Sequence, residues 1–164
     1  MLGLIGSDYL KFRDDLKTVI DPYTGNEYIA APAIMPDVAI IHGYKGDRFG
    51  GVTTHSYRED RLVAMAAKVT IAVVEELVEP DEVLPGLYEI YISPLHVDAV
   101  VVAAGGAHPT GCPGKYDTDF NHLDEYVAAS KDEGSFQEYL DKYIFGPEDH
   151  EEYLKIVGFD AYGK

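Results

Sequence analysis

Two short β-branched runs, each broken off by glycines and polar residues, constrain the fold of this chain more than any other feature. The first opens residues 36–51, PDVAIIHGYKGDRFGG, and the second opens residues 97–119, VDAVVVAAGGAHPTGCPGKYDTD. Such runs are typical of buried strands. Because the loops beyond the carboxyl ends of parallel strands hold ligands in α/β proteins, the two segments predict a small-molecule site.

The order of the expected elements favours an α/β fold with a sheet that is parallel in its core. Residues 43–55 read as a loop, since they are rich in glycine and polar residues. A helix is expected after this loop, because Ser56 and Glu59 have the spacing of a capping box. The expected strands cover residues 38–42, 69–74, 87–92 and 99–103.

The whole chain, residues 1–164, is expected to be a single α/β domain with three parts. Residues 1–35 form a lead-in arm with one short helical or extended piece, residues 36–118 the core, and residues 119–164 a helical tail. The tail is acidic, with 13 acidic and 4 basic residues from Asp117 onward. Its three helices are expected at residues 119–130, from a second capping box of Ser135 with Glu138, and from Pro147 to Gly158.

The net charge of −16 argues against binding to nucleic acid or to anionic membranes, since both require a basic face. No apolar run approaches the length of a membrane-spanning helix, and the first residues do not resemble a signal peptide. A single cysteine cannot form an internal disulfide bond. We therefore expect a cytoplasmic protein.

In the first loop, His42, Lys45 and Asp47 are candidate ligand-binding residues at the end of a strand. They are expected either to hold a ligand carboxylate and shape the pocket, or to form a structural turn. In the second case Asp47 caps backbone N–H groups and His42 satisfies a buried partner.

The second loop carries the sharper signal, Gly-Gly-Ala-His-Pro-Thr. Two glycines allow positive φ and close approach of the backbone to a ligand. An imidazole and a hydroxyl beside them can then bind a carbonyl or carboxylate; the alternative is a tight turn that only links two elements. The phosphate-loop and dinucleotide-binding spacings are both absent. The candidate binding residues are Gly105, Gly106, His108, Pro109 and Thr110.

Other chemistry is less well supported by the sequence. The six histidines and Cys112 lack the spacings of metal-binding motifs, so no metal site is expected. Cys112 is expected to be a buried or incidental thiol, because no neighbour in sequence lowers its pKa. The Glu75-Glu76 pair directly follows a strand, and paired acids in that position are more often surface residues than catalytic ones.

Three segments together resemble the A subunits of class I coenzyme A transferases, most closely the glutaconate CoA-transferase type. They are DPYTGNEYIAAPAIMPDVAIIHGYKGDRFGG, then REDRLVAMAAK followed by VTIAVVEELV, then VDAVVVAAGGAHPTGCPGKYDTD. The family's A subunits are longer, and their earlier glycine-rich segment is not found here. The resemblance therefore implies the C-terminal part of an A subunit, with an open, mostly parallel sheet flanked by helices.

Enzymes of this family move coenzyme A between an acyl-CoA and a carboxylic acid. The resemblance implies that the catalytic glutamate comes from a B subunit, so this chain holds no catalytic residue and works in a hetero-oligomer. Gly105, Gly106, His108, Pro109 and Thr110 would line the acyl pocket, supported by the loop that carries His42 and Asp47. Two alternatives remain open: a subunit of a hydrolase that opens rings of CoA thioesters in steroid breakdown, and a non-catalytic binding or assembly module.

Overall fold

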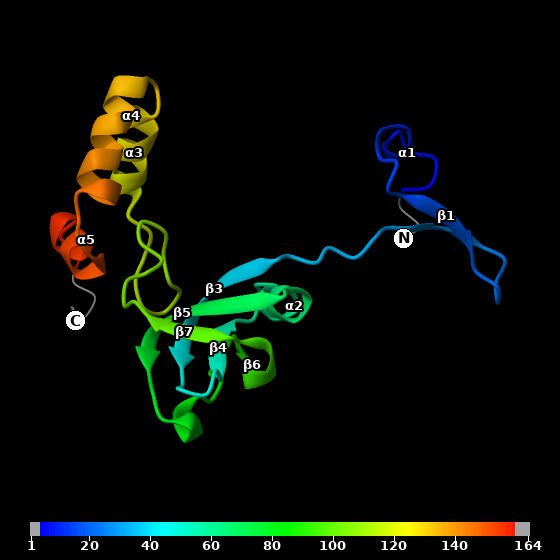
Figure 1. The fold of residues 1–164 in the computed structure, drawn as a ribbon, viewed down its shortest axis with the longest axis horizontal. Helices are drawn as coiled ribbons and strands as arrows, with labels where there is room; N and C mark the ends of the chain where they lie inside the picture. Colours follow the sequence, from blue (N-terminus) through cyan, green and yellow to red (C-terminus); the bar gives the residue numbers. More distant parts are fainter. Residues whose placement is uncertain (1–3, 160–164) are drawn as a thin grey trace. The chain divides into compact units, whose positions relative to one another are not determined.

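The computed structural model describes residues 4–159 (Figure 1). The chain divides into two compact units, with the boundary between Met35 and Pro36. The first unit contains a short helix, α1 (Tyr9–Phe12), and an antiparallel hairpin of β1 (Lys17–Ile20) and β2 (Glu27–Ala30). The short piece expected in this arm is therefore present, whereas the hairpin was not predicted. Its strands of four residues each are too short to give a clear alternating pattern.

The second unit is built on an open five-stranded sheet with the order β6-β4-β3-β5-β7. Its central strand β3 pairs in parallel with β5, and β5 pairs in parallel with β7, while β4 and β6 add an antiparallel edge. The predicted α/β fold with an open sheet, parallel in its core, is confirmed. The strands are β3 (Val38–Gly46), β4 (Val52–His55), β5 (Val69–Leu77), β6 (Glu89–Ile92) and β7 (Ala99–Val102).

One face of this sheet is covered within the second unit. Helix α2 (Asp60–Ala66) connects the β3–β4 hairpin to β5, and its Ala64 is buried. Two short 3₁₀ turns, η1 (Pro80–Glu82) and η2 (Pro94–His96), lie before β6 and β7. The buried cluster draws on β3, β4, α2, β5 and β6, and consists of Ile41, Val52, Ala64, Ala72, Val74 and Ile92.

The expectation of a loop over residues 43–55 was wrong. Gly43–Gly46 continue β3, a tight turn follows, and Val52–His55 form β4. A Cβ atom on Gly43 would lie 2.7 Å from Val52 Cγ1 and 2.8 Å from the Thr53 carbonyl oxygen. This glycine therefore marks close approach of a neighbouring strand, the role that glycine has inside sheets, and not a chain break.

Three predicted helix starts, near Ser56, Ser135 and Pro147, were also wrong. Helix α2 begins at Asp60 with no side-chain cap, so Ser56 and Glu59 form no capping box. Helix α4 (Glu133–Leu140) is capped by Asp132, whose carboxylate accepts the Ser135 N–H, and so starts before the predicted box. An aspartate three residues upstream offers the same hydrogen bond as a serine and adds a negative charge at the positive helix end.

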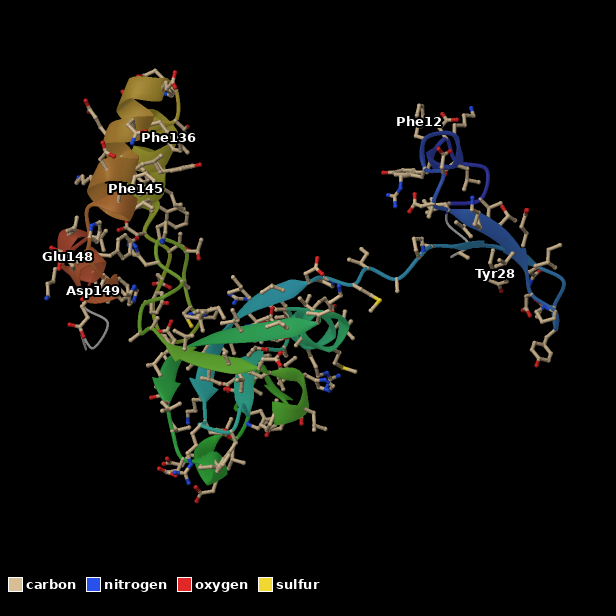
Figure 2. The ribbon with its side chains drawn as sticks, viewed as in Figure 1. Phe12, Tyr28, Phe136, Phe145, Glu148 and Asp149 are labelled. Atoms are coloured by element: carbon tan, nitrogen blue, oxygen red, sulfur yellow. The ribbon has the colours of Figure 1, made fainter. Side chains whose placement is uncertain are left out.

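The last helix, α5 (His150–Ile156), begins after Pro147 and is capped by Asp149, which accepts the Glu152 N–H (Figure 2). The first tail helix, α3 (Phe120–Ala129), agrees with its prediction, and Asp119 caps it. A π-helical turn, Asp141–Phe145, continues α4.

The tail is held together by aromatic rings. Tyr126 of α3 packs edge-on against Phe136 of α4 at 6.0 Å and against Tyr139 at 5.5 Å. Tyr143 in the π turn closes on Tyr139 at 4.8 Å and on the buried His122 of α3 at 4.6 Å. Such edge-to-face contacts add about 0.5–1.5 kcal/mol each to stability beyond the effect of the buried area.

None of the helices in the described part of the chain combines the length and the hydropathy that spanning a membrane requires.

Candidate active site

A buried carboxylate, Glu75, lies near the carboxyl end of β5 with 7% of its surface exposed. Its Oε2 accepts the backbone N–H of Gly105 at 2.8 Å, and its Oε1 accepts the hydroxyl of Tyr116. His42 Nε2 lies 2.8 Å from the same Oε1. Parallel pairing sets His42 opposite Val73, so Glu75, two residues further along β5, projects from the same face.

The environment of Glu75 holds it in the charged form. Burial by itself raises its pKa, but the contacts with His42, Tyr116 and Gly105 outweigh burial and bring the pKa below its ordinary value. The Glu75 carboxylate has the opposite effect on the pKa of Tyr116, which donates a hydrogen bond to it. Burial, and then the hydrogen bond to Glu75, raise the pKa of Tyr116 far above its ordinary value. Tyr116 therefore remains a proton donor to the Glu75 carboxylate.

Cys112 completes this cluster. One ligand-type atom each from His42, Glu75 and Cys112 lies within 4.8 Å of the others. Burial raises the pKa of the Cys112 thiol to about 11, with Glu75 adding to the effect, so the thiol is neutral at physiological pH. The prediction of a buried thiol is confirmed. Motif spacing did not predict this grouping, because its three residues come from distant segments of the chain.

The Gly-rich loop is anchored to this cluster by its first residue. Gly105 has φ +73°, and a Cβ there would lie 2.5 Å from a ring carbon of Phe159. A Cβ on Gly106 would lie 2.7 Å from the Ala103 carbonyl oxygen. Both glycines thus meet this chain's own atoms, and Gly105 also gives an unhindered N–H to Glu75.

His108 is held inside the loop and does not project from its tip. Its side chain is 2% exposed. Its Nδ1 lies 2.7 Å from the hydroxyl of Tyr153, and its Nε2 lies 3.3 Å from Asp119 Oδ2. Burial raises the pKa of Tyr153 to about 12, so the phenol stays protonated, and contacts at both ring nitrogens fix the orientation of His108.

A pocket of about 370 Å³ opens beside this histidine. Its wall combines His108 and Pro109 of the loop, the latter after a cis peptide bond, with tyrosines of the tail. The volume is within the range of small-molecule sites. The residues that line it are His108, Pro109, Tyr139, Tyr143, Ile144, Pro147, Asp149 and Tyr153.

Two candidates from the sequence are engaged in local turns. The Asp47 carboxylate, 3% exposed, accepts the N–H groups of Phe49 and Gly51 and so closes the β3–β4 turn. The exposed Thr110 donates its hydroxyl to the Ala107 carbonyl oxygen. The structure thus joins His42 and Gly105 through Glu75, and places Gly106, His108 and Pro109 in the following loop. Asp47 and Thr110 instead form hydrogen bonds with backbone groups of their own turns.

Sequence reasoning missed Glu75, Tyr116 and Tyr153. The expectation that the paired acids are surface residues was wrong for Glu75 and holds only for Glu76, which is partly exposed and pairs with Lys115 at 3.2 Å. A signal was available in the strand itself. Glu75 directly continues an apolar run, whereas Tyr116 and Tyr153 reach the site from segments whose approach no local pattern predicts.

A sequence model described as Coenzyme A transferase matches residues 4–103, well over half of the chain. This chain belongs to the coenzyme A transferase family. The A subunit of glutaconate CoA-transferase from Acidaminococcus fermentans is 35% identical over 147 residues, which cover 88% of this chain and 46% of that relative. The A subunit of 3-oxoadipate CoA-transferase from Pseudomonas knackmussii is 32% identical over 149 residues, covering 90% and 52%.

The likeness extends to three dimensions. The crystal structure of glutaconate coenzyme A-transferase from Acidaminococcus fermentans superposes with a TM-score of 0.78 at 34% identity, over 88% of this chain and 46% of that one. A cholesterol ring-cleaving hydrolase subunit from Rhodococcus jostii is also similar, at 31% identity over 156 residues, covering 88% and 52%. The family model and the match to the glutaconate CoA-transferase structure do not favour the hydrolase alternative. The chain spans about half the length of these relatives.

Proposed function

We propose that this chain is the A-subunit part of a CoA-transferase, which moves coenzyme A between an acyl-CoA and a carboxylic acid together with a B subunit. One observation carries the proposal: 88% of the chain superposes on glutaconate CoA-transferase with a TM-score of 0.78 at 34% identity. Two of the relatives are A subunits of CoA-transferases, one named for glutaconate and the other for 3-oxoadipate. Coenzyme A enters as the acyl-CoA substrate.

The nucleophile is assigned to a glutamate of the B subunit. Its carboxylate attacks the thioester carbonyl and expels CoA thiolate, which leaves an acyl anhydride. The thiolate then attacks the glutamyl carbonyl, the free acid departs, and a glutamyl-CoA thioester remains for the second acid. Glu75 does not fit the role of nucleophile, because it is buried and its oxygens already contact Gly105, Tyr116 and His42.

This chain's own contribution is the wall of the acyl pocket. The loop of Gly105, Gly106, His108, Pro109 and Thr110 follows β7 at the carboxyl edge of the parallel strands, where α/β sheets hold ligands. Glu75 fixes the start of the loop, and the Asp119–His108–Tyr153 contacts fix its middle. A pocket wall held this firmly would orient an acyl group with little loss of conformational freedom on binding. His42 and the Asp47 turn support this wall from β3.

The test is CoA exchange by the complex purified with its B subunit. Radiolabelled acyl-CoA is offered with a panel of mono- and dicarboxylic acids, and transfer of CoA to one of them is expected. Substitution of the B-subunit glutamate by Ala should abolish transfer while the complex remains assembled. Opening of a ring-bearing acyl-CoA by addition of water, with its thioester intact and no transfer of CoA, would instead establish the hydrolase, and a complex inert towards every thioester would establish the non-catalytic module.

The proposed setting is a cytoplasmic hetero-oligomer. A single, buried cysteine, which cannot form an internal disulfide bond, supports a reducing compartment. Fractionation of the native host, with this chain and its B subunit followed by immunoblot, checks the location.

A further inference from the structure

Three side chains of the types that ligate metal ions meet beside Gly105: His42 of β3, Glu75 of β5 and Cys112, which lies between β7 and α3. One ligand atom from each lies within 4.8 Å of the other two. The His42 side chain is 16% exposed, and Glu75 and Cys112 are buried. Such a set differs in chemistry and burial from the acidic groups that cover the surface of this chain.

The imidazole of His42 presents an unpartnered nitrogen to this cluster. Its Nε2 is shielded from solvent, and within residues 4–159 no group meets it in hydrogen-bonding geometry. The distance of 2.8 Å to Glu75 Oε1 is therefore a contact without the alignment of a hydrogen bond. Buried polar atoms almost always have a partner in native proteins. A cation held between this nitrogen and the carboxylate would supply one.

The Glu75 carboxylate is oriented by two donors and keeps the capacity to ligate a cation. Its Oε2 accepts the Gly105 N–H, and its Oε1 accepts the Tyr116 hydroxyl. Each carboxylate oxygen has two lone pairs, so Oε1 can accept from Tyr116 and bind a cation at the same time. In metal sites, groups that hydrogen-bond to the ligands fix the direction of those ligands. Tyr116 and Gly105 hold the corresponding positions around Glu75.

A tight turn fixes the position of Cys112. Its backbone N–H donates to the Tyr116 carbonyl oxygen at 2.9 Å, and the Tyr116 N–H donates back to the Cys112 carbonyl oxygen at 3.0 Å. Gly114, within the turn, has φ +80°. The thiol and the phenol are thus brought to the same carboxylate by one short backbone structure.

We propose that His42, Glu75 and Cys112 form a binding site for one transition-metal ion, for which Zn²⁺ is the best match. Imidazole, carboxylate and thiolate all ligate zinc, whereas Mg²⁺ and Ca²⁺ prefer oxygen ligands. One carboxylate and one thiolate balance the two charges of the ion, so the occupied cluster is neutral in its buried setting. Bond lengths of about 2.0–2.3 Å place the ligand atoms of a tetrahedral zinc ion about 3.3–3.8 Å apart. Small side-chain rotations bring the cluster to that geometry.

The ion fastens the segment after the Gly-rich loop to the sheet, because its ligands come from β3, β5 and that segment. The inference goes beyond the proposed function, since the ion takes no step in CoA exchange. It also departs from the sequence-based expectation of no metal site. That expectation rested on motif spacing, and the three ligands are distant from one another along the chain.

The experiment titrates metal-free protein with Zn²⁺ alone. The protein is purified in its full assembly from its native host, without a histidine tag, and stripped with a chelator. Cys112→Ala should weaken one site per copy of the chain by at least about a hundredfold, since losing a residue that only supports a ligand already costs about 10–100-fold. The matched control is His55→Gln on β4, outside the cluster, which should leave binding unchanged.

Two further readouts identify the thiol as a ligand. The pKa of Cys112 is about 11, so binding of zinc should release one proton more from the wild type than from Cys112→Ala. Calorimetry in buffers of different ionisation enthalpy measures this release. Co²⁺ in place of Zn²⁺ should give a thiolate-to-cobalt charge-transfer band in the wild type that Cys112→Ala lacks. Thermal melts of the metal-free variants show that they fold.

Three results overturn the inference. The first is zinc binding that Cys112→Ala leaves unchanged, which would assign the ion to surface carboxylates. The second is displacement of zinc by an equal concentration of Mg²⁺. The third is a wild type without the thiolate-to-cobalt band, which decides the matter even where Cys112→Ala does not fold.

Discussion

Replacing Glu75 by Gln tests whether the buried carboxylate organises the site. The carboxylate accepts from Gly105 and Tyr116 and lies 2.8 Å from His42. The amide keeps one acceptor oxygen and turns an NH₂ group towards the remaining donors. Losing one to two charge-assisted hydrogen bonds, with a buried donor left unpaired, destabilises the fold by about 3 kcal/mol. For a chain of this length, that loss lowers the melting temperature by about 6–12 °C.

Glu76→Gln is the matched control, because Glu76 is the next residue and pairs with Lys115 near the surface. It should change the unfolding free energy by less than about 1 kcal/mol. Both variants are melted beside the wild type and followed by far-UV circular dichroism. The argument is refuted if Glu75→Gln and Glu76→Gln melt within error of each other.

The effect of Glu75 should also depend on pH in one direction. Its pKa is lowered in the folded chain, so its stabilising contribution is complete above the ordinary glutamate pKa and is lost as the pH falls through the folded value. The difference in melting temperature between wild type and Glu75→Gln should therefore shrink in acid. A difference that stays constant or grows as the pH falls contradicts a native carboxylate held in its charged form.

Three further substitutions have defined outcomes. Gly43→Ala should destabilise the fold by about 2–3 kcal/mol in urea titrations, because its Cβ meets the neighbouring strand, whereas Gly134→Ala in helix α4 should be neutral or slightly stabilising. Asp132→Ala should cost about 1 kcal/mol as a lost helix cap, and equal or greater loss in Ser135→Ala would restore the serine as the cap. Cys112→Ser should leave CoA exchange intact in the assembled complex, and a folded but inactive variant would show that the thiol takes part in the chemistry.

The strands of the parallel core were predictable because short runs of β-branched and other apolar residues are a strong strand signal. Val38, Val69 and Ala99 each begin a run of mostly apolar residues, and each begins a strand in the structure. The antiparallel strand β4 was missed because its partner segment contains Gly43 and Gly46. A prediction from local sequence treats such glycines as the ends of strands, whereas here they leave room for side chains of neighbouring strands.

The sequence pointed to both His42 and the Gly-rich loop, but not to the residue that joins them, and ligand binding by these residues stays a prediction. The Gly-rich loop was located from the abrupt end of β7, and Gly105 does meet His42 through a shared partner. That partner, Glu75, was not predicted because neighbouring acids usually lie at the surface. Only the register of β3 with β5, which is a tertiary property, shows that its side chain points into the cluster.

The one cysteine of the chain gives the site a built-in reporter. Cys112 is 2% exposed, its pKa is about 11, and it lies against the carboxylate that anchors the loop. A thiol reagent can modify it only when that region opens, so the labelling rate measures opening of the site on the intact protein. Slower labelling upon addition of an acyl-CoA or a partner chain would register binding without an enzymatic assay, a tag or an added fluorophore.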